Sequence, residues 1–226
     1  MKNKYLIKFM MTVFGMATLI SSIVYIRGEG IDDLLFYFSG LDKSETVWVK
    51  NIDLFAFFKW LWVYFPFWLI AGYFVEVYYA NQKLTQIRYG NRKKWYNEMY
   101  RELFLIFLAY LAGLWILLLS GGFLQFVVIA VHAFFMMSIF ILIKELFNSG
   151  VTAFFTVLVL EVFSYMAGEE HVLPDDFLIS FWGMASRFGY PSNLSEFRLY
   201  SVIAVQLAIF YSILVLVKKF RRECRA

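Results

Sequence analysis

Two ionisable side chains lie inside long stretches of apolar residues, where a charge is costly. His132 falls within 103–143, which contains no Asp, Glu, Lys or Arg, and Glu161 interrupts the apolar stretch 151–168. An ionisable residue at membrane depth usually has a partner or a functional role. A hydrogen bond between His132 and Glu161 would satisfy both side chains. We interpret the pair first as a structural contact between helices, with a proton or substrate site as the alternative.

A second group combines basic and aromatic side chains around a glycine. It consists of Arg88, Tyr89, Gly90, Asn91, Arg92, Lys93, Lys94 and Trp95. Gly90 and Asn91 predict a turn, and Trp95 lies four residues before Met99 on the helix expected to follow. Arginine binds carboxylates bidentately, and tryptophan is a common interface anchor. The pattern favours a rigid element that fits a groove on a partner protein. A basic loop that contacts anionic lipid is the alternative.

Residues for catalysis and metal binding are scarce. The chain has two histidines and one cysteine, whereas zinc sites use three or four such ligands. Glu169 and Glu170 resemble the start of the Glu-Glu-x-x-x-Arg motif of CAAX-type intramembrane proteases, but Pro174 stands where that motif needs arginine. We therefore expect no catalytic residue, no metal and no cofactor bound by this chain. An intramembrane protease remains the weaker alternative.

The composition predicts the elements that hold these residues. The chain has 226 residues, of which 62% are hydrophobic and 17% are charged. Soluble domains average roughly 45–50% apolar and about 25% charged residues. This composition excludes an ordinary soluble domain, a disordered chain and a disulfide-built secreted domain. We predict an all-α polytopic membrane protein, with residues 1–226 forming a single transmembrane domain.

Stretches free of charged residues predict six transmembrane helices. An unbroken helix over 103–143 would extend about 60 Å, twice the bilayer core, so the chain must turn back near its Ser-Gly-Gly sequence. The predicted spans are 7–26, 55–79, 102–119, 122–143, 151–168 and 199–217. The short turn after the fourth span makes the fourth and fifth spans antiparallel neighbours.

Basic residues predict the orientation of these spans. With the N-terminus inside, 15 of the 21 Lys and Arg residues lie on the inner side, and five lie in the outer loops 27–54 and 169–198. Inner loops of membrane proteins are enriched in Lys and Arg. Both termini and the segment 80–101 are therefore predicted to be cytoplasmic.

The last outer loop predicts a short helix. Pro174, followed by Asp175 and Asp176, is a favourable helix start. The apolar stretch 177–190 is too short to span a bilayer. Its helix either lies in the membrane interface or is re-entrant, dipping into the membrane and returning. The sequence leaves both arrangements open.

The segment from Arg88 to Trp95, placed between the second and third predicted spans, resembles the R-x-G-S-R-x-x-W pattern of small ABC-2 type transporter permeases. These are membrane subunits of bacterial ABC exporters, common in peptide and bacteriocin export or immunity systems. The whole layout is similar, although Asn91 stands where serine is commoner. The resemblance implies that 80–101 carries a coupling helix that contacts a separate ATPase subunit. It also implies that the last outer loop closes the pathway, with an outer gate of Phe177, Phe181 and Trp182.

The resemblance also implies a function. The chain has no G-x-x-x-x-G-K-[ST] motif, so ATP and Mg would be bound by the partner ATPase. A second permease subunit, identical or homologous, and membrane lipid are further expected partners, and no nucleic acid is expected. The implied role is export of a peptide or other amphipathic compound through the bacterial cell membrane. The alternative is an ATP-independent immunity or scaffold protein that binds a toxin or a partner membrane protein.

Overall fold

The computed structural model describes residues 2–27, 54–81, 92–118, 123–169, 178–184 and 193–223. This part of the chain is helical and contains no strand, which confirms the predicted all-α class. Its elements are α1 (Lys2–Arg27), α3 (Leu54–Ala80), α5 (Arg92–Leu118), α6 (Phe123–Phe147), α7 (Gly150–Glu169), the 3-10 helix η2 (Ser180–Gly183) and α8 (Asn193–Glu223).

Three helices are long and apolar enough to cross a membrane. They are Trp60–Ala80 in α3, Phe126–Phe147 in α6 and Gly150–Ala167 in α7. Shorter apolar stretches occupy Tyr5–Ile20 in α1 and Phe197–Ile213 in α8. The described residues therefore hold fewer such helices than the six that the sequence predicts.

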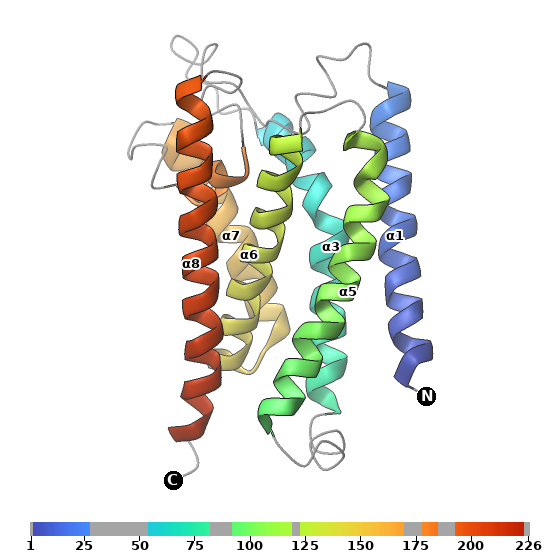
Figure 1. Ribbon diagram of the computed structural model, residues 1–226, viewed down its shortest axis with the longest axis vertical. Helices are drawn as coiled ribbons and strands as arrows, with labels where there is room; N and C mark the ends of the chain where they lie inside the picture. Colours follow the sequence, from blue (N-terminus) through green and yellow to red (C-terminus); the bar gives the residue numbers. More distant parts are fainter. Residues whose placement is uncertain are drawn as a thin grey trace.

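The helices form one elongated bundle (Figure 1). The start of α1, the end of α8, the α6–α7 turn, the end of α3 and the start of α5 all lie at one end of it, which we call the lower end. Consecutive helices run in opposite directions between the two ends, as short connections favour. An even number of passes brings the described termini to the same end.

Two helices, α3 and α6, occupy the centre of the bundle. Helix α3 contacts α1, α5, α6 and α7, and helix α6 contacts α3, α5, α7, α8 and η2. Aromatic rings of α3 fill much of the core. Phe57 stacks on Tyr165 of α7 at 4.5 Å between ring centroids, and Phe67 stacks on Tyr110 of α5 at 5.2 Å. These contacts fix α3 against α7 and α5.

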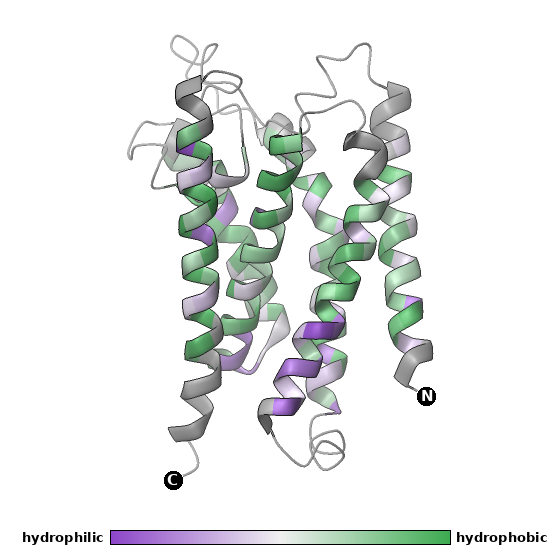
Figure 2. Cartoon of the chain, viewed as in Figure 1, coloured by the Kyte–Doolittle hydropathy of each residue, from purple (hydrophilic) through white to green (hydrophobic). Residues whose placement is uncertain are grey.

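The surface of the bundle is largely apolar. On α7, Phe155, Val159 and Phe163 follow one another at helical spacing and are each more than half exposed. Figure 2 shows hydrophobic residues along most of the length of the helices and the polar residues of α5 gathered at the lower end. Such a surface suits surrounding lipid, because contiguous exposed apolar patches of this kind are uncommon in soluble proteins.

A two-residue turn joins α6 to α7. Asn148 has a φ of 51°, in the left-handed region that asparagine tolerates better than most residues. Its N–H donates to the carbonyl of Lys144, and Ser149 Oγ accepts the N–H of Thr152 at the start of α7. The turn closes one helix and caps the next. The predicted antiparallel packing of these two helices is confirmed.

Candidate functional site

His132 of α6 and Glu161 of α7 meet in the interior of the bundle. Neither side chain has any exposed surface, and His132 Nε2 lies 2.9 Å from Glu161 Oε1. The antiparallel packing of α6 and α7 brings the two residues together. The hydrogen bond that the sequence allows is therefore present.

Gln206 of α8 is the third member of this buried group. Its Oε1 lies 3.3 Å from His132 Nδ1, and its Nε2 donates to the carbonyl oxygen of Trp182 at 3.3 Å. Gln206 is fully buried. Sequence reasoning missed it, although a signal was present: Gln206 is the only amide side chain between residues 199 and 217.

The η2 segment covers this group directly. An added Cβ at Gly183 would lie 2.6 Å from His132 Cδ2, so the backbone of η2 rests against the imidazole and only glycine fits there. Tyr64 of α3 donates its hydroxyl to the carbonyl of Gly183 at 3.3 Å. The Tyr64 ring meets the His132 ring edge-on, with centroids 5.4 Å apart. The imidazole therefore has neighbours on α3, α7, α8 and η2.

The predicted outer gate residues belong to the same region. Phe181 is fully buried and meets the ring of Tyr165, and Trp182 is half-buried against Phe135 of α6. Phe177 lies outside the described residues. The described part of the last predicted outer loop thus packs into the bundle, between α6 and α7.

Two buried polar atoms near His132 have no hydrogen-bond partner among the described residues. They are Glu161 Oε2 and Trp60 Nε1. Trp60 has its ring centroid 6.0 Å from that of His132. Unpaired polar atoms in a protein interior are uncommon and require an explanation. No three His, Cys, Asp or Glu side chains of the described segments lie together as a metal site.

An ion pair fixes the lower end of the same helices. Lys144 Nζ of α6 lies 2.5 Å from both carboxylate oxygens of Glu76 on α3. An added Cβ at Gly150 would lie only 1.6 Å from Glu76 Oε1. The carboxylate therefore occupies the space beside Gly150, at the N-terminus of α7, where the helix dipole favours a negative charge.

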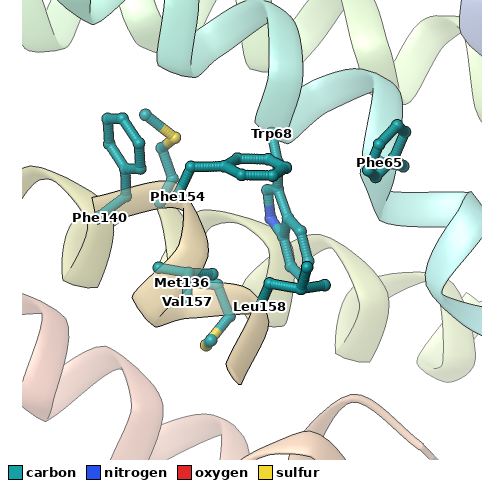
Figure 3. Close-up of a pocket in the computed structure, with 8 residues that line it drawn as sticks. Phe65, Trp68, Met136, Phe140, Phe154, Val157 and Leu158 are labelled. Atoms are coloured by element: carbon teal, nitrogen blue, oxygen red, sulfur yellow. The ribbon is translucent and has the colours of Figure 1, made fainter. Parts of the chain in front are cut away.

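Two spaces lie between α3, α6 and α7. One is an apolar gap of about 10 Å³. Its lining includes Trp68, Met136 and Phe154 (Figure 3). An apolar gap of this size offers no polar partners to a bound water. The other is an open groove of about 510 Å³ with aromatic walls and the Glu76–Lys144 pair at its polar end.

The predicted partner-contact segment, Arg88 to Trp95, is described only in part. Residues 88–91 lie outside the described residues, and α5 begins at Arg92. The side chains of Arg92 and Lys93 are not described, and Lys94 is exposed.

Trp95 does not have the position that the sequence suggests. Its side chain has no exposed surface and packs against the rings of Tyr78, Tyr79 and Tyr96, with centroids 4.9–5.3 Å apart. Tyr79 and Tyr96 both donate to Glu145 Oε1 of α6. Trp95 therefore anchors α5 within this chain, and the predicted contact with a partner protein would involve the residues before Trp95.

No protein-family model, curated protein or solved structure matches the chain.

Proposed function

We propose that this chain is the membrane-spanning permease subunit of an ATP-driven ABC exporter. Its six helices would all cross the bacterial cell membrane, with both termini and the lower end of the bundle in the cytoplasm. A separate ATPase subunit would bind ATP and Mg, and a second permease subunit, identical or homologous, would complete the transporter.

The main support for this proposal is that α3 and α5, the helices on either side of residues 82–91, are both held firmly in the bundle. Trp95 is buried against α3, and the Tyr79 and Tyr96 hydroxyls both donate to Glu145 of α6. A cytosolic motor can move membrane helices only through a cytoplasmic element that is firmly joined to them. Displacement of this connection would be passed to α3, α5 and α6 together. The two termini, in contrast, are each attached to one helix.

Further support comes from the opposite half of the bundle and from its groove. The η2 segment packs into the bundle, as the resemblance to ABC-2 permeases leads us to expect of an outer re-entrant element. The groove between α3, α6 and α7 has apolar walls and a charged end, a combination that suits an amphipathic compound. We propose a peptide or a similar amphipathic molecule as the transported substrate.

Site-specific cross-linking tests the partner. A photo-reactive amino acid at Asn91 should capture, in the native cell, a protein that contains G-x-x-x-x-G-K-[ST]. The matched probe at Arg221, in the predicted cytoplasmic tail, should not. Failure to capture an ATPase at Asn91 would remove the exporter proposal and favour the ATP-independent scaffold.

Charge reversal then tests the contact. Arg88→Glu combined with Arg92→Glu should weaken ATPase co-purification in mild detergent and lower transport, because partner carboxylates would meet like charges. Arg221→Glu combined with Arg222→Glu is the control of equal charge change. Equal retention of the ATPase by both double variants would leave 88–92 as a basic lipid-facing segment. Trp95→Ala is unsuitable here, since it would remove a core side chain.

A further inference from the structure

The hydrogen bonds around His132 determine which of its ring nitrogens carries a hydrogen. Gln206 Nε2 lies 3.3 Å from the carbonyl oxygen of Trp182. A carbonyl only accepts, so the NH₂ group of Gln206 must face Trp182 and its Oε1 must face His132. Oε1 also only accepts, and it lies 3.3 Å from Nδ1. Nδ1 therefore carries a hydrogen.

The other nitrogen shares a single proton with Glu161. Nε2 and Oε1 lie 2.9 Å apart, a distance that one proton bridges. With that proton, the pair is neutral overall. Without it, the lone pair of Nε2 faces a carboxylate oxygen, and an uncompensated negative charge remains where both side chains are fully buried. The closed bundle therefore requires exactly one shared proton at this position.

The second oxygen of Glu161 indicates where this proton resides. Oε2 has no hydrogen-bond partner among the described residues. An unpaired oxygen is less costly on a neutral carboxylic acid than on a carboxylate. A Glu161 side chain protonated on Oε1 and donating to Nε2 of a neutral imidazole is the arrangement that avoids an unpaired carboxylate oxygen. The hydrogen bond to Gln206 stabilises the tautomer that this arrangement needs.

We propose that His132, Glu161 and Gln206 form a proton-binding site, in which Glu161 releases its proton when η2 separates from the bundle. On release, the Oε1–H bond breaks, the proton passes to water, and a carboxylate remains that needs hydration. Water can reach it once η2 moves, because the backbone of Gly183 rests on the imidazole. The site would act whether or not an ATPase binds the chain.

The groups around the site link proton release to η2. Gln206 holds the Trp182 carbonyl and Tyr64 holds the Gly183 carbonyl, so two neighbours of the imidazole also hold η2. Among the residues that the structure describes, the titratable groups facing His132 are Glu161 from α7 and Tyr64 from α3. Helix α8 contributes an uncharged amide, and η2 contributes backbone at Gly183. Glu161 is thus the acid whose proton the site exchanges.

Nitrogen NMR tests the location of the proton. The chain has only two histidines, so His171→Gln leaves His132 as the single ¹⁵N-histidine signal in the full-length protein in detergent. At neutral pH we expect a hydrogen on Nδ1 and an accepting Nε2, and the same pattern in Glu161→Gln, whose NH₂ group can donate to Nε2. A bare Nδ1, or hydrogens on both nitrogens, would overturn the assignment.

Thiol reactivity tests the link to η2. Met184, next to η2, is fully buried, so Met184→Cys in a Cys224→Ser chain reports separation of this segment. The maleimide reaction rate is divided by that of the SDS-unfolded protein at the same pH, which cancels thiol ionisation. As pH rises, the ratio should increase by up to about tenfold per pH unit, the dependence of a one-proton equilibrium.

Two variants distinguish this site from a general effect of pH. Glu161→Gln has no proton to release in this range, so the normalised rate should stay low and independent of pH. Glu76→Gln removes the carboxylate at the lower end and should keep the pH dependence of the unmodified chain. An equal slope in Glu161→Gln, or no slope in the unmodified chain, would refute the proposal.

Discussion

Gly150 leaves room for the Glu76 carboxylate beside Lys144. The carboxylate of Glu76 lies where any larger residue would place its Cβ, and Lys144 is almost completely buried. A buried ammonium group needs a partner, because water cannot solvate it there. The ion pair joins α3 to α6 beside the first residue of α7, so a single glycine permits a contact among three helices.

Enlarging this glycine should disturb the ion pair. Gly150→Ala should displace Glu76 and leave Lys144 without its partner, which would lower the free energy of unfolding by about 1–3 kcal/mol. Thermal unfolding in detergent measures the loss. Gly15→Ala is the matched control, because no atom lies within 4 Å of its added Cβ. The loss should also disappear in a Glu76→Ala background, where no carboxylate is left to displace.

For individual residues, the sequence predicts some side-chain contacts and not others. His132 and Glu161 are recognisable because ionisable residues are exceptional in apolar stretches. Gln206 is a weaker signal, since an isolated amide in a helix has many possible partners. Trp95 is misleading, because the same residue type anchors interfaces and fills cores. Only the folded chain, which places it among Tyr78, Tyr79 and Tyr96, resolves that ambiguity.

Among the helices, α1 and α5 approach each other closely at Gly113. An added Cβ at Gly113 of α5 would lie 2.6 Å from Ala17 Cβ and 2.8 Å from the carbonyl oxygen of Phe14, both on α1. Small residues at such crossings let helices pack closely in membranes. The backbone carbonyl cannot move aside as a flexible side chain can, so α1 itself must shift if Gly113 is enlarged.

Gly113→Ala should therefore separate α1 from α5 and destabilise the protein by about 1–3 kcal/mol, the usual cost of overpacking. Disulfide formation between cysteines placed on the facing sides of α1 and α5 should slow in parallel. Ala112→Leu adds more volume next to it on the exposed side of α5 and should have little effect. Similar losses in the two variants would contradict a specific contact at Gly113.

The helix bounds show where sequence patterns are informative. The predicted 55–79 and 122–143 agree closely with α3 and α6, since both are bounded by polar residues or turn signals. Helix α5 begins at Arg92, ten residues before the predicted span. Hydrophobicity alone cannot locate that start, because Trp95 and Met99 make the polar first turns of α5 part of the core.

For the whole molecule, the shared end of the described termini bears on orientation. Six passes through a bilayer would place both termini on one side, and the basic residues predict that this side is the cytoplasm. The described helices alternate in direction between the two ends of the bundle, and the charge distribution predicts which end is cytoplasmic.

Cysteine labelling on intact cells measures this orientation. In a Cys224→Ser chain, Thr46→Cys should react with a membrane-impermeant maleimide, and Asn91→Cys should react only after the cells are permeabilised. The native Cys224, kept in an otherwise unchanged chain, should behave like the cysteine at position 91. Labelling of position 91 but not 46 in intact cells would reverse the orientation and remove the basis for an ATPase contact at the lower end.

The two-residue turn between α6 and α7 has a consequence for biogenesis. If α6 or α7 entered the lipid by itself, its ionisable residue, His132 or Glu161, would have no hydrogen-bond partner. Because only Asn148 and Ser149 separate the two helices, α7 follows α6 immediately. The hydrogen bond between His132 and Glu161 can therefore form as α6 and α7 enter the membrane together. The translocon would thus receive α6 and α7 as one hairpin, with the hydrogen bond between His132 and Glu161 already formed inside it.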